Sequence, residues 1–200
     1  MVQSLRSGAP PEVVYTSDNA PLALTNWSPA GDVVTVYHFF SQRLGLLSLK
    51  ERDSIRWMEH LPGHQAPGHF SPDGRWLAYG SNESGLNEIW IASYPDFNNR
   101  RQLSTGGGVE PVWCPCGEIF FRRGNQFFSS AVQLGPDVSA APARLVFEVK
   151  DFLDTPGRSH DVSSDGKTLY VVKRAEPATA DRVHVIANWF DELERAVPRH

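Results

Sequence analysis

The chain has little of what marks disulfide-rich or metal-binding proteins. Its 200 residues include two cysteines, Cys114 and Cys116, with one residue between them. A bridge at that spacing would close a strained ring, so we expect two thiols and no disulfide framework. Two thiols are half of the four ligands that a structural zinc takes. The sequence therefore predicts no metal site and no cofactor.

Long apolar runs and an excess of positive charge are missing as well. No run approaches the ~18 apolar residues of a membrane span, and the start, MVQSLRSGAPPEVV, lacks the apolar middle of a signal peptide. Lys and Arg total 19 against 23 Asp and Glu, a net charge of −4. This balance gives no general attraction to nucleic acid or to an anionic membrane. The basic pairs Arg100-Arg101 and Arg122-Arg123 are accordingly expected to be solvated.

Turn formers and aromatic residues are plentiful. The chain has 16 Gly and 15 Pro, and aromatic residues make up 11% of it. Aromatic side chains favour strands, and Gly and Pro favour the turns between them. With 40% hydrophobic residues, the composition predicts a folded all-β chain of many short strands joined by tight turns.

One turn motif occurs four times at nearly constant spacing. Its glycines are 43, 43 and 49 residues apart. In each motif an apolar residue ends a strand, and the glycine takes the left-handed conformation that closes a type I turn with a bulge. A period of ~40–45 residues is that of one four-stranded propeller blade. The aligned segments are NWSPAG (26–31), HFSPDG (69–74), VWCPCG (112–117) and DVSSDG (161–166).

The residues between the motifs supply the other strands, so we expect an all-β array of about four four-stranded antiparallel blades. Each motif is predicted to join the first and second strands of a blade. The expected second strands are 33–39, 75–80, 118–122 and 168–173. The expected third strands are 44–49, 88–92, 126–132 and 182–186, and the expected outer strands are 54–58, 101–104 and 144–149.

The two ends of the chain are predicted to differ from the repeats. Asn188 can cap a short helix over 188–197 that Pro198 stops, so the fourth blade lacks an outer strand. The run 12–16 is expected to supply that strand. The predicted organisation is a flexible N-terminus at 1–11 and one propeller domain at 12–198, with blades at about 20–63, 64–108, 109–155 and 156–187.

Six aromatic residues lie in the interior of the predicted strands. Each such side chain can bury ~150–250 Å², and a blade has two faces to cover. We therefore expect packing between blades from Trp27, Phe70, Trp76, Tyr79, Trp90 and Trp113.

The repeat resembles the WD40-like propeller repeat of TolB-type proteins. Residues 69–93, HFSPDGRWLAYGSNESGLNEIWIAS, match it best, and ANWFDEL at 187–193 resembles the end of bacterial propellers that are attached to serine/threonine kinases. The resemblance covers roughly 12–195 and implies a bacterial β-propeller. It also implies a periplasmic or other extracytoplasmic location, although this chain shows no signal peptide. Because the repeat serves many tasks, it implies the fold more than the function.

Four blades are few for this family, whose propellers typically have six or more. Three arrangements stay open: a compact four-bladed ring, the C-terminal part of a longer propeller, or a homo-oligomer whose chains complete a larger ring. A fragment-like chain whose four units still form a propeller-shaped array is favoured.

Polar residues precede the first strand of several blades, where the mouth of a propeller channel lies. We expect a rim there that contacts a protein or peptide, because binding residues are often carried on the loops of a rigid scaffold. The alternative is that these side chains satisfy backbone groups at strand ends. The predicted rim residues are His69, Glu110, Arg158, His160 and Asp161.

Ser159-His160-Asp161 has the composition of a catalytic triad. Adjacent residues of a strand point to alternate faces and cannot pass a proton along one line. The chain also has no Gly-x-Ser-x-Gly elbow, so no catalytic residue is expected. The sequence predicts a non-catalytic binding or scaffolding module. The alternative is an accessory propeller domain or fragment of a larger enzyme, such as a propeller-bearing hydrolase or lyase, or of a serine/threonine kinase.

Overall fold

The computed structural model describes residue 10 and residues 12–17, 21–51, 53–135, 137–154 and 158–174. This part of the chain is built from strands β1 to β15 and turns, with no helix in it. Consequently, no helix of the described part could cross a membrane. The predicted strand 182–186 and helix 188–197 lie outside the described residues, as does nearly all of 1–11.

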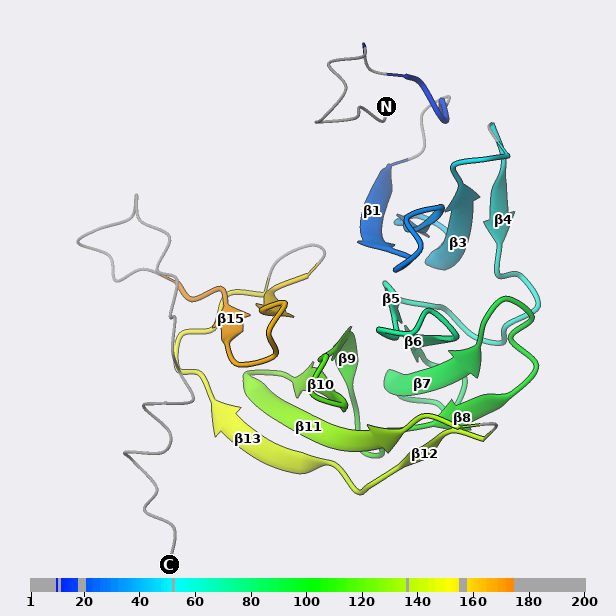
Figure 1. Cartoon of the computed structure of the whole chain (residues 1–200). Coiled ribbons are helices and arrows are strands. Elements are labelled where there is room, and N and C mark those ends of the chain that lie inside the picture. Colours follow the sequence, from blue (N-terminus) through cyan, green and yellow to red (C-terminus); the bar gives the residue numbers. More distant parts are fainter. Residues whose placement is uncertain are drawn as a thin grey trace, which may run out of the picture.

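The strands form four antiparallel sheets, each made from consecutive strands (Figure 1). The first two sheets have four strands each, as predicted. The first contains β1 (Leu22–Trp27), β2 (Val33–His38), β3 (Arg43–Ser48) and β4 (Ile55–Trp57). The second contains β5 (His69–Phe70), β6 (Trp76–Ser81), β7 (Glu88–Ser93) and β8 (Arg100–Gln102).

The third and fourth sheets vary this plan. In the third, two short strands share the outer position beside β11, and the fourth has two strands among the described residues. The third contains β9 (Val109–Trp113), β10 (Glu118–Arg123), β11 (Gln126–Gln133), β12 (Ser139–Ala140) and β13 (Arg144–Glu148). The fourth contains β14 (His160–Val162) and β15 (Leu169–Val171).

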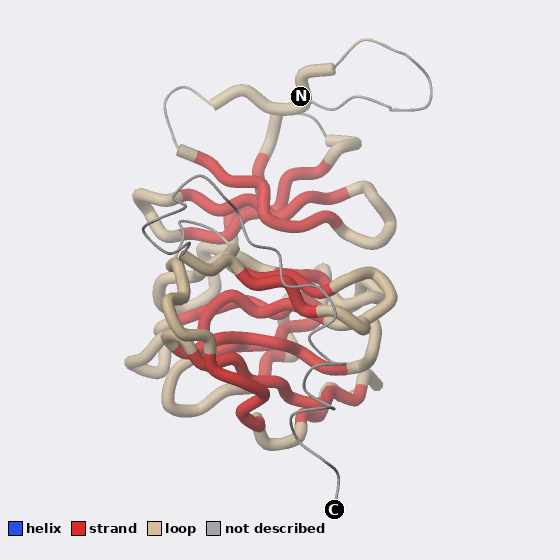
Figure 2. Tube along the Cα trace, turned by 90° about the vertical axis from the view of Figure 1, so that its left-hand side faces the viewer, coloured by secondary structure: helices blue, strands red, loops and turns tan. Residues whose placement is uncertain are grey.

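The sheets are arranged as successive blades around a common centre. The first strands of neighbouring blades, β1, β5, β9 and β14, contact one another in that order. In Figure 1 the described blades form an open arc, with a gap between the first and the fourth. Figure 2, turned by 90°, shows the strands stacked in layers without a helix. The all-β propeller-type array predicted from the repeat is confirmed.

The four aligned glycines adopt the left-handed conformation that the turns require. The φ angles are +71° at Gly31 and Gly74, +85° at Gly117 and +72° at Gly166. The third turn is one residue shorter than the others. Trp113 pairs with Ile119, six positions on, whereas Phe70 pairs with Leu77, seven positions on. The alignment on glycine is therefore right, but the strand after the third glycine is shifted by one residue.

The prediction of two free thiols is wrong, because Cys114 and Cys116 form a disulfide. The turn itself brings the side chains of its first and third residues together. In the second turn these residues are Ser71 and Asp73, and the Ser71 hydroxyl donates to Asp73 Oδ1 at 2.6 Å. Cysteines at the same two positions have Cα atoms 5.0 Å apart, within the usual span of a disulfide. The turn geometry thus overrides the short spacing in sequence.

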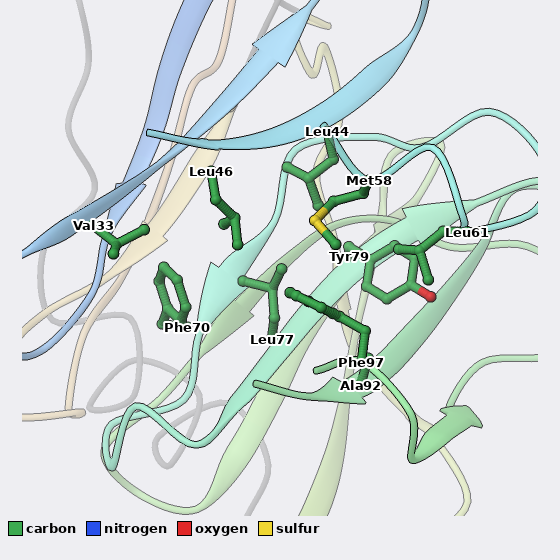
Figure 3. Packing of buried hydrophobic residues seen from close by; sticks show 10 residues of the cluster. All are labelled: Val33, Leu44, Leu46, Met58, Leu61, Phe70, Leu77, Tyr79, Ala92 and Phe97. Carbon is green, nitrogen blue, oxygen red and sulfur yellow. The ribbon is translucent and has the colours of Figure 1, made fainter. Parts of the chain in front are cut away.

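The hydrophobic core lies between successive blades. Figure 3 shows the cluster between the first and second sheets, where Phe70 of the second packs with Val33 and Leu46 of the first. In the next interface Trp113 packs with Trp76 and Ile91 of the second sheet. The aromatic residues of the second and third motifs thus pack on the preceding blade.

Trp27 departs from this pattern. It is 49% exposed, whereas Phe70 and Trp113 at the same repeat position are 2% and 4% exposed. The reason is that no blade precedes the first one among the described residues. The predicted burial of Trp27 is therefore wrong for this part of the chain, while Trp76 and Tyr79 are buried as predicted.

The N-terminal run lies on the first blade. Val14 is buried and packs with Val36 and Leu47, and its carbonyl accepts a hydrogen bond from Asp53 N at 3.0 Å. This face of the sheet is turned away from the second blade, as a ring-closing strand would need. Its pairing with 182–186 concerns residues outside the described part and stays a prediction.

Candidate functional site

A buried carboxylate, that of Glu110 on β9, joins the third blade to the fourth. Glu110 Oε1 accepts a hydrogen bond from Arg122 Nη2 at 2.5 Å. Its Oε2 accepts one from Ser159 N at 2.9 Å and one from the Ser159 hydroxyl at 2.5 Å. Since Ser159 directly precedes β14, Glu110 fixes the beginning of the fourth blade on the third.

Arg122 extends this network toward the surface. Its Nη2 also donates to Asp154 Oδ1 at 2.5 Å, and the Asp154 side chain is 75% exposed. The guanidinium carbon lies 4.9 Å from the centre of the Phe152 ring, at the range of a cation–π contact. One arginine therefore connects a buried carboxylate, an aromatic face and an exposed carboxylate.

The backbone of Glu110 is in a sparsely populated conformation. Its φ is +55°, and the pairing of β9 with β10 shifts between Phe120 and Arg122. A non-glycine residue in the left-handed region costs on the order of 1–3 kcal/mol and persists where its surroundings fix it. The hydrogen bonds to Arg122 and Ser159 are the contacts that fix Glu110 in this bulge.

The charges of the network follow from its contacts. Burial alone would raise the pKa of Glu110, but contacts with His160, Arg122 and Ser159 lower it to about 2. Burial lowers the pKa of His160, although Glu110 opposes this effect. The His160 side chain is fully enclosed, with Nδ1 3.4 Å from Glu110 Oε2 and its ring edge-on to Phe127. At neutral pH the network holds an ionised Glu110 and a neutral His160.

The other three residues of the predicted rim are less deeply buried. They are His69, Arg158 and Asp161. Arg158 Nη1 is 3.9 Å from Asp161 Oδ1, and their side chains are 18% and 60% exposed. Burial, followed by the charge of Arg158, lowers the pKa of His69 to about 4. His69 Nδ1 lies 3.0 Å from Phe70 O and 3.4 Å from Trp113 N. This nitrogen can donate to the first or accept from the second, so His69 also serves backbone groups at a strand end.

All five residues of the predicted rim therefore lie around one end of the β5, β9 and β14 strands, in two layers. Glu110 and His160 are buried beneath the surface, at 8% and 3% exposure. Asp161 contributes the accessible charge, and Arg158 is mostly covered. The rim that can meet a partner is smaller than the set named from sequence.

Sequence reasoning did not assign Arg122 and Asp154 to this site. The expectation that Arg122 is solvated is wrong, because it is 6% exposed. The available signal was an arginine directly following the apolar run Ile119–Phe121 on a short strand. A charged residue in that setting is seldom buried unless it is paired.

No proton relay connects Ser159, His160 and Asp161, the residues whose types match a catalytic triad. The Ser159 hydroxyl donates to Glu110, and neither ring nitrogen of His160 makes a hydrogen bond in the described part. Ser159 is itself fully buried. Within the described ranges no three His, Cys, Asp or Glu side chains are grouped to hold a metal ion.

We expect the free energy of unfolding to fall as the pH drops from about 6.5 toward about 4. The folded-state pKa of His69, about 4, is below the value of ~6.5 in unfolded chains. The unfolded state binds more protons between these values, so the contribution is complete above pH ~6.5 and is lost toward pH 4. For His69 it is on the order of 3 kcal/mol, and His160 acts in the same direction. Glu110, with a lowered pKa, loses its contribution at still lower pH.

Urea unfolding between pH 4 and 8 measures this slope. His69→Asn should make it shallower, and His60→Asn, at an exposed site, is the matched control. An unchanged slope in His69→Asn would contradict the neutral, enclosed imidazole.

Comparison with known proteins gives the fold. No family model and no curated protein matches the chain. The chain is similar in structure to TolB from Acinetobacter baumannii, with a TM-score of 0.53, 18% identity, and coverage of 84% of this chain and 44% of that one. It is also similar to the dihydro-heme d1 dehydrogenase NirN, with a TM-score of 0.53, 17% identity, and coverage of 82% and 37%.

A third similar structure is the hydrazine synthase of Kuenenia stuttgartiensis, with a TM-score of 0.52, 14% identity, and coverage of 86% and 60%. The chain thus spans 37% to 60% of the length of these proteins. At such identities the likeness concerns the fold, not the activity. The described part of the chain has the β-propeller fold of TolB-type proteins.

Proposed function

We propose that the chain is a non-catalytic propeller module that binds a protein or peptide segment beside Arg158 and Asp161. The observation that carries the proposal is the buried Glu110 network, which fixes residues 158–161 on the third blade. Loops that are held on a rigid scaffold are the usual carriers of binding groups. Asp161, with its side chain 60% exposed, is an accessible charge on β14.

The accessible charge favours a partner segment with a basic side chain. Asp154 and Asp161 are exposed carboxylates, whereas Arg158 is mostly covered. Complementary charge raises the rate and specificity of association more than its affinity. A lysine or arginine of a partner would therefore be guided to Asp161.

A displayed random-peptide library, selected on the immobilised chain, tests this function. We expect peptides with basic residues to be enriched. Their affinity should drop at least about tenfold for the Arg158→Ala, Asp161→Ala double variant. His160 is left unchanged because its enclosed side chain would report on packing instead.

The control is the Arg144→Ala, Glu118→Ala double variant, which removes an ion pair between β13 and β10 of the third blade. It should bind as the wild type does. Equal affinity for all three proteins, or the absence of any enriched peptide, would refute binding beside Asp161.

A second candidate function is that of an accessory domain or fragment of a larger protein. The chain spans 37% of NirN and 60% of hydrazine synthase, both named as enzymes, and no blade formed by the described residues covers Trp27. The adjoining coding sequence discriminates between the candidates. A kinase or membrane-spanning segment upstream would support a sensor module, and a hydrolase or lyase domain would support the enzyme fragment.

An extracytoplasmic location belongs to the same proposal. The TolB-like fold supports it, and so does the disulfide of the third turn, because disulfides persist mainly in oxidising compartments.

A further inference from the structure

The disulfide of the third turn has one enclosed and one accessible cysteine. Cys114 is 0% exposed and belongs to the core cluster between the third and fourth blades, with Phe120, Phe127 and Leu169. Cys116 is exposed at the tip of the turn. An attacking group can therefore reach Cys116 but not Cys114.

The turn does not need this bond to form. The second and fourth turns, each one residue longer, hold the same two positions together without it, because a serine hydroxyl donates to an aspartate carboxylate. The distances are 2.6 Å between Ser71 and Asp73 and 2.5 Å between Ser163 and Asp165. A bridge across one intervening residue also removes little entropy from the unfolded chain. Opening the disulfide should therefore leave the fold in place.

One contact of Cys114 suits a leaving group. The backbone N–H of Cys116 points at Cys114 Sγ, with the nitrogen 3.1 Å from the sulfur. A hydrogen bond of this kind stabilises the thiolate that leaves and opposes the cost of burying its charge among the apolar side chains of the cluster. Exposed disulfides with a good leaving group are the readily exchanged ones.

We propose that Cys114–Cys116 is a thiol–disulfide exchange site for small thiols of the glutathione class. The thiolate of the small thiol attacks Cys116 Sγ, the bond between the two cysteine sulfurs breaks, and its electron pair goes to Cys114 Sγ. A mixed disulfide then joins the small thiol to Cys116. A second thiolate attacks the sulfur of the bound small thiol, which releases Cys116 as thiolate and the small disulfide as product. The two cysteine thiolates take up protons from water, so two thiols are oxidised while one protein disulfide is reduced.

Opening of the disulfide also affects the contact between the third and fourth blades. The third turn lies against the fourth at Gly166, where a Cβ atom would come within 3.1 Å of Cys114 Sγ. When the bond opens, the two sulfurs move apart and this contact must adjust. The redox state of the site thus sets how tightly the third and fourth turns pack.

Glutathione buffers of graded ratio test the site on the folded chain, with acid quenching, alkylation and mass spectrometry as the readout. We expect the wild type to pass from oxidised to reduced without denaturant. The single variants separate the two sulfurs. With oxidised glutathione, Cys114→Ser should acquire a mixed disulfide on Cys116 at least about tenfold faster than Cys116→Ser acquires one on Cys114.

The double variant Cys114→Ser, Cys116→Asp introduces the serine–aspartate pair of the second and fourth turns and is the matched control. Its Tm should not respond to thiols, whereas reduction should lower the wild-type Tm by about 2–4 °C. Circular dichroism shows whether each variant is folded. A wild-type disulfide that resists thiols until the chain unfolds, or equal rates for the two single variants, would overturn the proposal.

Discussion

Replacement of Arg122 by alanine is expected to lower the free energy of unfolding by about 3–5 kcal/mol, because it leaves a buried carboxylate without its cation. Glu110 and Arg122 are each 8% exposed in their side chains, and the pKa of Glu110, about 2, keeps it ionised. The variant would also free Asp154 and the face of Phe152. Urea unfolding with far-UV detection measures the loss.

Arg144→Ala is the control for this substitution. Arg144 forms an ion pair with Glu118 at 3.0 Å, but its side chain is 63% exposed. Exposed pairs contribute about 0–1 kcal/mol because water and salt screen them. Similar losses in the two variants would show that the Glu110 network is not buried as described.

Two tryptophans at the same repeat position are expected to differ widely in their contribution to stability. Trp113→Ala should cost about 3–5 kcal/mol, as deletion of a large buried side chain does. Trp27→Ala should cost about 1 kcal/mol or less, because Trp27 is already half in water. The exposures are 4% for Trp113 and 49% for Trp27, and thermal unfolding of the two variants compares them.

The comparison of these two variants also tests whether the leading face of the first blade is free of another blade. If Trp27→Ala proved as costly as Trp113→Ala, another blade would cover the leading face of the first sheet in solution. That blade would come from a second copy or from another part of the chain. The fluorescence of Trp27 is the difference between the spectra of the wild type and a Trp27→Phe variant, and a red-shifted difference spectrum would support the half-exposed state.

The repeat was sufficient to predict the blades. Glycines at constant spacing mark turns whose left-handed φ no other residue adopts easily, and so Gly31, Gly74, Gly117 and Gly166 locate all four hairpins. Strand ends agree with the predictions within about two residues. The one-residue shift after Gly117 was not predictable, because the length of a bulged turn depends on pairing that the motif letters do not record.

The site was only partly predictable, and for a physical reason. Polar residues before the first strands indicated where the blades meet, and this brought Glu110, Arg158, His160 and Asp161 together. Burial depends on the packing of neighbouring blades, which one sequence does not reveal. For this reason the sequence predicts a solvated Arg122 and an accessible His160, whereas both side chains are buried.

The disulfide is another feature that the spacing of residues in the sequence did not predict. The aligned motifs already placed Cys114 and Cys116 at the positions of Ser71 and Asp73. Sequence distance argued against a bond, while turn geometry decided for it. A comparison among the four turns carries more information than the spacing of two residues alone.

Nuclear Overhauser effects between aromatic rings and labelled methyl groups test the stacking of blades most directly. The structure predicts contacts from the Phe70 ring to methyl groups of Val33 and Leu46, and from the Trp113 ring to methyl groups of Ala78 and Ile91. In each case the partner belongs to the preceding blade. Rings that contact only residues of their own sheet, or those of the following one, would contradict the propeller arrangement.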